Sequence, residues 1–138
     1  MSWDVFISKE EVKNLEDGNL PPIAEKTEFK NILNNLIPGI KYTEDDWAVF
    51  NDSDCSIEFN FGEDETVTHV MLYIRGGGDH PIAIIQSICD HCDCYAMDCA
   101  TGEQMEFDES DQNSFKAWQD YRSKVIERSS LNYLPKSS

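Results

Sequence analysis

A strict alternation of polar and apolar residues is the feature that most constrains how this chain can fold. It occupies the run Ser56-Ile57-Glu58-Phe59-Asn60-Phe61. Successive side chains of a strand point to opposite faces, so the run predicts a strand with one buried and one wet face. One wet face is typical of antiparallel sheets, because parallel strands are usually buried on both sides. We therefore expect an antiparallel sheet.

Short runs rich in aromatic and β-branched residues predict the other strands. With the alternating run, they cover residues 3–8, 47–50, 55–61, 67–75, 94–99 and 104–107. Acidic and glycine-containing turns separate the three middle runs, and an antiparallel meander is their simplest pairing. The sequence thus predicts five to six strands.

Apolar residues at helical spacing predict three helices. The first begins near Glu25 with Thr27 as N-cap, and it ends at Pro38-Gly39. The second has Asp79 as N-cap and Pro81 in its first turn. The third spans residues 113–128, where Phe115, Trp118, Tyr121 and Val125 form an apolar stripe.

These elements predict a single α+β domain over residues 1–128, with three helices packed on one mostly antiparallel sheet. Residues 129–138 are expected to be a flexible tail. A length of 138 residues suits one domain, and a hydrophobic content of 40% supplies enough apolar surface for a core.

The net charge of −16 is concentrated in the middle of the chain. Residues 42–115 hold eighteen acidic residues against one basic residue, Arg75. Such a field repels nucleic acid and anionic membranes, and it attracts basic proteins or cations. A surface that only keeps a protein soluble normally mixes both signs. We therefore interpret the acidic stretch as a binding surface, with simple solvation as the alternative.

The acidic runs fall in predicted loops and at strand ends. The candidate partner-binding residues are Glu44, Asp45, Asp46, Asp52, Asp54, Glu63, Asp64, Glu65, Asp108 and Glu109.

No motif predicts catalysis. None of His69, His80 and His91 lies in a nucleophile-elbow or His-Glu-x-x-His context. The Gly76-Gly77-Gly78 loop has the composition of a phosphate cradle, but no Lys-Ser/Thr follows it, and Asp79 puts an anion where a phosphate would bind. A tight structural turn is the better interpretation. We predict no enzyme activity and no cofactor.

Five cysteines suit a reducing cytoplasm better than a secreted disulfide framework. The segment from Cys89 to Cys94, with Cys99 beyond, offers soft zinc ligands, but its spacing is not that of paired C-x2-C knuckles. We expect free structural thiols and no metal, and a metal-binding protein remains an alternative. The chain shows no secretory leader and no apolar run able to span a bilayer, so we expect a cytoplasmic location.

Two resemblances extend this interpretation. The string Tyr73-Ile74-Arg75-Gly76-Gly77-Gly78-Asp79, followed by Asp98-Cys99-Ala100-Thr101-Gly102-Glu103, resembles motifs of a group of small bacterial proteins, and it carries over no catalytic residue. The size and acidity of the chain are similar to those of immunity proteins of bacterial polymorphic toxin systems, including contact-dependent growth inhibition.

The second resemblance implies a cytoplasmic inhibitor that blocks a cognate toxin domain, commonly a basic nuclease, by covering its active site. The alternative is an adaptor or chaperone for a basic effector protein. Both hypotheses make a basic protein the partner, with neither nucleic acid nor membrane bound.

Overall fold

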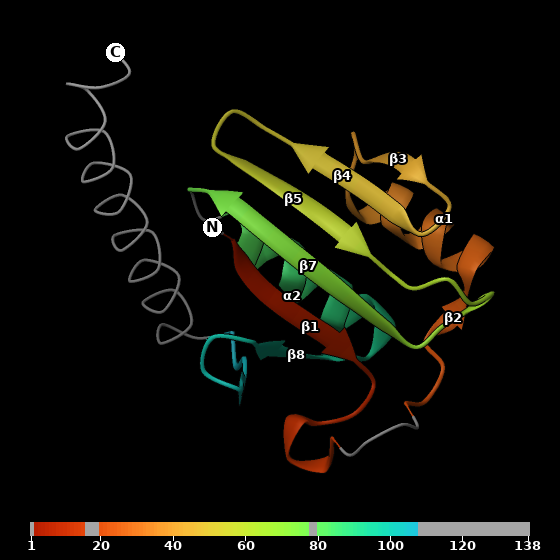
Figure 1. Ribbon diagram of the computed structural model, residues 1–138, viewed down its shortest axis with the longest axis vertical. Coiled ribbons are helices and arrows are strands. Elements are labelled where there is room, and N and C mark those ends of the chain that lie inside the picture. Colours follow the sequence, from red (N-terminus) through yellow and green to blue (C-terminus); the bar gives the residue numbers. More distant parts are fainter. Residues whose placement is uncertain (1, 16–19, 78–79, 108–138) are drawn as a thin grey trace, which may run out of the picture.

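The computed structural model describes residues 2–15, 20–77 and 80–107 (Figure 1). Within them, a seven-stranded sheet forms the centre of the fold. Its strands, in spatial order, are β3 (Lys41–Glu44), β4 (Trp47–Asn51), β5 (Cys55–Asn60), β7 (His69–Gly76), β1 (Trp3–Ser8), β8 (Tyr95–Asp98) and β9 (Glu103–Gln104). All six pairings are antiparallel. The α+β class and the antiparallel sheet are as predicted, whereas the predicted count of five to six strands is wrong.

Two of the missed strands form a separate small sheet. β2 (Ala24–Glu25) pairs with β6 (Thr66–Val67), so the predicted run over residues 67–75 is in fact two strands. Backbone hydrogen bonds of 2.7 Å extend this pairing on both sides, from Ile23 N–H to the Val67 carbonyl and from Lys26 N–H to the Glu65 carbonyl. Propensity alone does not predict such two-residue strands, because the tertiary hydrogen bonds define them.

Two α-helices, α1 (Lys26–Leu36) and α2 (His80–Cys92), lie together against one face of the main sheet (Figure 1). A 3-10 turn, η1 (Val12–Asn14), interrupts the segment that follows β1. The N-cap of α1 is Glu25, so the prediction of Thr27 is wrong by two residues. Pro81 does lie in the first turn of α2, as predicted.

The two helices end in different ways. α1 ends at Leu36, two residues before Pro38, and Gly39 then adopts a φ of +95°. α2 ends at Cys92, and the next residue, Asp93, adopts a left-handed φ of +55°. The Cys94 N–H then donates a 2.9 Å hydrogen bond to the Cys89 carbonyl. Asn and Asp tolerate this conformation better than other non-glycine residues. The predicted third helix (residues 113–128) and tail (residues 129–138) lie outside the described residues.

The hydrophobic core lies between the two helices and the covered face of the sheet. Alternate residues of the central strands and the inner faces of both helices are buried; the fully buried ones include Val5, Ile7, Phe29, Leu33, Ile57, Phe59, Leu72, Ile74, Ile85, Ile88 and Ala96. In the alternating run, Ile57 and Phe59 thus face the core as predicted. Neither described helix has the length and apolarity needed to cross a lipid bilayer.

Candidate partner-binding surface

The first predicted acidic run lies at the turn between β3 and β4. Glu44 ends β3, and Asp45 and Asp46 lead into β4. The Asp46 carbonyl accepts a 3.2 Å hydrogen bond from the Phe61 N–H and a 3.5 Å hydrogen bond from the Asn60 side chain. The turn is therefore held against the end of β5.

The second acidic run follows β5 at the same end of the sheet. Glu63, Asp64 and Glu65 are all exposed. The Glu65 carbonyl accepts from the first residue of α1, and Thr66 Oγ1 donates a 3.1 Å hydrogen bond to the Glu25 carboxylate. Two runs that are separate in sequence thus meet in space. We call the set Glu44, Asp45, Asp46, Glu63, Asp64 and Glu65 the acidic end.

Two lysines of α1 offset part of this charge. Lys30 Nζ lies 3.0 Å from one Asp45 carboxylate oxygen, and Lys26 Nζ lies 3.7 Å from the other. The Lys30 hydrogen bond and charge, followed by the Lys26 charge, hold the pKa of Asp45 below its usual value. Both lysines precede residue 42, so the count of charges over residues 42–115 left them out. Asp45 is therefore part of the fold's own ion pairing.

The buried stem of Lys26 and the aromatic contacts of Lys30 fix these two cations. Lys26 is 4% exposed, which places its aliphatic chain in the core with only the ammonium near the surface. Lys30 Nζ lies 5.3 Å from the centre of the Tyr42 ring. Among the described residues, neither lysine has an ion-pair partner other than Asp45. The other five carboxylates of the acidic end make no ion pair within the described chain.

Asp52 and Asp54 lie at the opposite end of the β4–β5 hairpin. Five strand residues separate the two ends, a span of about 17 Å. Asp52 accepts hydrogen bonds of 2.7 Å from the Asp54 and Cys55 N–H groups, and its other oxygen lies 2.8 Å from His80 Nδ1. The His80 hydrogen bond, followed by the two backbone ones, holds the pKa of Asp52 well below its usual range. This carboxylate stabilises its own turn.

The glycine loop closes against the same turn. Gly76 has a φ of +101°, and a Cβ there would come within 2.3 Å of the Asp54 carbonyl oxygen. The Gly77 N–H donates a 2.7 Å hydrogen bond to that oxygen. The geometry of these two glycines is that of a tight structural turn; Gly78 and Asp79 lie outside the described residues, as do Asp108 and Glu109.

The face of the main sheet that neither described helix covers carries a second surface, which no motif in the sequence indicated. The strand register aligns Trp47, Asn60, Met71, Phe6 and Met97 as neighbours across five strands. Tyr73 lies on the same face, and its ring stacks with that of Trp47 at a centroid distance of 6.1 Å. We call Phe6, Trp47, Met71, Tyr73 and Met97 the open-face patch. All five are partly exposed.

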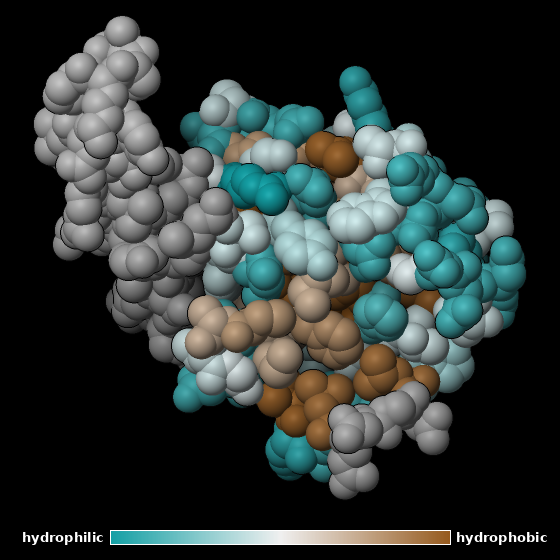
Figure 2. All heavy atoms as spheres, in the orientation of Figure 1, coloured by the Kyte–Doolittle hydropathy of each residue, from teal (hydrophilic) through white to brown (hydrophobic). Residues whose placement is uncertain are grey.

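Figure 2 shows this face of the molecule. Hydrophobic colours gather over its lower centre, whereas hydrophilic colours dominate on the right, where the β3–β4 turn lies in Figure 1. The signal for the patch is present in the sequence, because Met71 and Tyr73 alternate with the buried residues Val70, Leu72 and Ile74. The wet face was predicted from Ser56, Glu58 and Asn60 alone. Met71 and Tyr73, which lie opposite Asn60 and Glu58 on β7, add large side chains to the same face.

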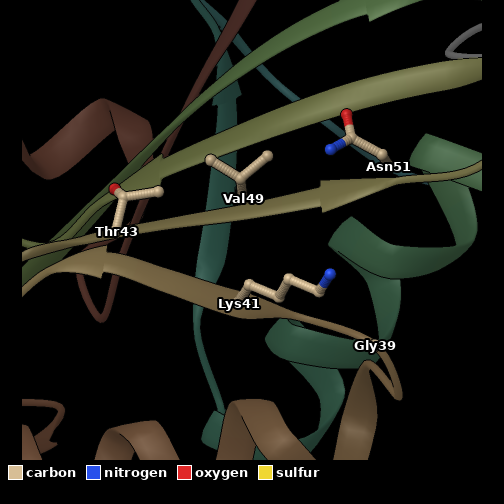
Figure 3. A pocket seen from close by; sticks show the side chains of 5 residues that line it. All are labelled: Gly39, Lys41, Thr43, Val49 and Asn51. Carbon is tan, nitrogen blue, oxygen red and sulfur yellow. The ribbon is translucent and has the colours of Figure 1, made fainter.

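A shallow hollow of about 270 Å³ lies on β3 and β4 (Figure 3). Gly39, Lys41, Thr43, Val49 and Asn51 line it. It brings together one cation, one amide and one hydroxyl with no carboxylate or histidine. The lining therefore offers polar contacts but no acid–base pair for chemistry.

The cysteines and histidines form no reactive arrangement in the described part of the chain. Cys89, Cys92 and Cys94 are buried, and burial is the main cause that raises the pKa of Cys89 and of Cys94 to about 12. Among the described residues, no three His, Cys, Asp or Glu side chains are disposed to hold a metal ion. Cys55 lies beside Asp52, but burial, followed by Asp52 itself, raises its pKa to about 12. A nucleophilic thiolate requires the opposite shift.

Comparison with known proteins adds no family. No protein-family model matches the chain, and no curated protein and no solved structure shows significant similarity to it.

Proposed function

We propose that this chain is a cytoplasmic binding protein of the immunity type, which neutralises a basic toxin domain by covering its active site. The observation that carries the proposal is the convergence of two acidic runs at one end of the β4–β5 hairpin. Five carboxylates there, those of Glu44, Asp46, Glu63, Asp64 and Glu65, have no cationic partner within the described chain.

Charge mimicry gives a mechanism without chemistry. A nuclease binds the phosphates of its substrate through lysine and arginine side chains. Clustered carboxylates at one end of the sheet present a comparable array of anions to such a groove. Complementary charges of this kind speed association and favour the correct partner more than they add affinity. The inhibitor then excludes the substrate by occupying its site.

The test uses the gene directly upstream, because immunity genes normally follow their toxin genes. Expression of the upstream product alone should arrest growth, and co-expression of this chain should restore it. Replacing Glu63, Asp64 and Glu65 with lysine should abolish protection. The matched control replaces three exposed acids elsewhere, Asp90, Glu103 and Glu106, with lysine and should still protect.

The outcomes separate the hypotheses. Protection by the acidic-end variant equal to that of wild type would reject the mechanism, and a harmless upstream product that this chain fails to bind would reject the immunity function. A harmless upstream product that binds this chain would favour the adaptor or chaperone instead.

A further inference from the structure

The acidic end and the open-face patch are continuous. Trp47 directly follows Asp46 in the chain, and the Asn60 side chain reaches the Asp46 carbonyl at 3.5 Å. From Asn60, the cross-strand register leads directly to Met71 and then to Phe6. A protein surface placed against the acidic end therefore also meets this row of large side chains.

We propose that the open-face patch is the core of the interface with the basic partner and that the acidic end forms part of its charged rim. This inference rests on the proposed function. Fully buried interface cores are enriched in aromatic residues and methionine and depleted in charged residues, and their rims are polar. The patch consists of three aromatic residues and two methionines, Phe6, Trp47, Tyr73, Met71 and Met97.

Charge complementarity selects a basic protein as the occupant. Residues 1–107 hold twenty-two acidic and six basic residues, so any protein that settles on this face approaches a strongly anionic domain. The acids nearest the patch add to this field, since Asp4 and Glu58 lie directly opposite Tyr73 on the neighbouring strands. Arg75 pairs with Glu58 at 2.6 Å, which leaves Asp4 as the charged residue on the other side of Tyr73.

The covered face cannot serve the same purpose. Both described helices pack against it, and its central residues Val5, Ile57 and Leu72 are fully buried (Figure 1). On the open face, Phe6 stacks with His69 at 5.7 Å, and Trp47 stacks with Tyr73. These ring pairs hold the side chains in place before binding, which lowers the entropy lost when a partner arrives.

The two parts of the interface should affect different rate constants. Rim charges act at a distance and control the association rate, so their contribution falls as salt screens them. Apolar contacts at an interface core form only after docking and mainly control the dissociation rate. A kinetic experiment can therefore distinguish the patch from the acidic end.

The probe is the purified upstream gene product carrying an inactivating substitution in its own active site, immobilised for surface-binding kinetics. The test variants of the full chain are Phe6→Thr and Met71→Thr, which keep good strand formers in β1 and β7. Leu36→Thr on α1 is the control, because it removes a half-buried apolar side chain from the covered side. Thermal unfolding of each variant confirms that it is folded at the assay temperature.

We expect Phe6→Thr and Met71→Thr to raise Kd by roughly ten- to a hundredfold, mainly through faster dissociation, as truncation of a hot-spot residue does. Leu36→Thr should bind as wild type does. If the acidic-end lysine variant binds slowly while both patch variants bind normally, the inference is overturned and the proposed function stands. If wild type itself does not bind the probe, the proposed function and the inference both fail.

A labelling experiment identifies the occupant directly. In the full chain with Cys99→Ser, which removes the exposed native thiol, Met97→Cys should react with a maleimide when the protein is alone and be protected in the complex. Slow labelling of the protein alone would show that a second copy or another part of the chain covers the patch, and it would overturn the inference. Sedimentation of the same sample tells these two occupants apart.

Discussion

The two ends of the β4–β5 hairpin both carry aspartates in exposed turns, but the carboxylates there have different surroundings. Asp52 accepts two backbone hydrogen bonds of 2.7 Å and faces His80 at 2.8 Å. Asp64, at the other end, is exposed and makes no hydrogen bond or ion pair within the described chain. The comparison shows that acidic residues with the same sequence signature either build a turn or remain available to a partner.

Asp45 is an intermediate case. It belongs to the acidic end by position, yet it lies within 4 Å of two lysine ammonium groups. Lys26 is only 4% exposed, and its ammonium has no other ion-pair partner among the described residues, so Asp45 supplies the negative charge beside a largely buried cation. Position at an end of the sheet therefore does not by itself decide which carboxylates are free.

The largest effect is expected from breaking the turn that contains Asp52. In Gly76→Ala, the alanine would have to adopt the positive φ of Gly76, and its Cβ would lie 2.3 Å from the backbone oxygen of Asp54. The backbone must therefore move. We expect the free energy of unfolding to fall by about 2–4 kcal/mol, in the range for backbone strain combined with a steric clash. Denaturant unfolding measures the change.

Gly102→Ala is the matched control for that substitution. Gly102 also has a positive φ, +74°, but its added Cβ would meet no atom within 4 Å. The free energy of unfolding of Gly102→Ala should therefore fall by only about 1 kcal/mol, the cost of the positive φ itself. Equal losses for the two variants would mean that the close approach of Gly76 to Asp54 does not matter.

A smaller and pH-dependent effect is expected for Asp52→Asn. The His80 hydrogen bond and the two backbone hydrogen bonds lower the pKa of Asp52 in the folded state. A lowered folded-state pKa adds stability that is fully present above the unfolded pKa, about 3.9, and is lost as the pH falls through the folded pKa. Wild type should therefore be more stable than Asp52→Asn at neutral pH, and the difference should shrink below about pH 4.

Urea unfolding of both proteins at pH 7, 4 and 2.5 tests this expectation. Asp64→Asn serves as the control, because its exposed carboxylate has no partner in the described chain, and it should change stability little at neutral pH. A difference between wild type and Asp52→Asn that stays constant down to pH 2.5 would contradict the assigned role of the Asp52 carboxylate.

Local periodicity predicted much of the fold. The strand over residues 3–8, the start of β4 and the Pro81 turn of α2 were all predicted from patterns of a few residues. The missed elements depend on distant partners. β2 has only two residues, and its pairing with β6 brings together positions more than forty residues apart. Nothing within so short a segment specifies such a pairing.

The candidate site was predictable in its parts but not in its arrangement. The sequence identified the acidic runs, yet it could not show that residues 44–46 and 63–65 meet while Asp52 lies at the other end. The lysines near Asp45 were counted with a different region of the chain, since they lie fifteen or more positions away on α1. The open-face patch was missed because its composition depends on which strands are neighbours, and only the register places Met71 and Tyr73 opposite Asn60 and Glu58.

The smallest effect separates Asp45 from its exposed neighbours at the acidic end. Asp45→Lys removes the shared partner of Lys26 and Lys30 and places a third ammonium beside them, whereas Glu63→Lys adds a cation among acids. We expect Glu63→Lys to change stability by less than about 0.5 kcal/mol, as most surface substitutions do, and Asp45→Lys to be measurably less stable than Glu63→Lys. The penalty of Asp45→Lys should shrink as salt rises, because the new ammonium stands at an exposed position where salt screens its charge. Asp45→Asn removes the ion pair without adding the repulsion, so its unfolding temperature in low salt should lie between those of Asp45→Lys and Glu63→Lys.

Thermal unfolding of the three variants at about 20 mM and 500 mM salt provides the measurement. If Asp45→Lys and Glu63→Lys unfold at the same temperature in low salt, Asp45 is as free as its neighbours and all six carboxylates of the acidic end are available to a partner.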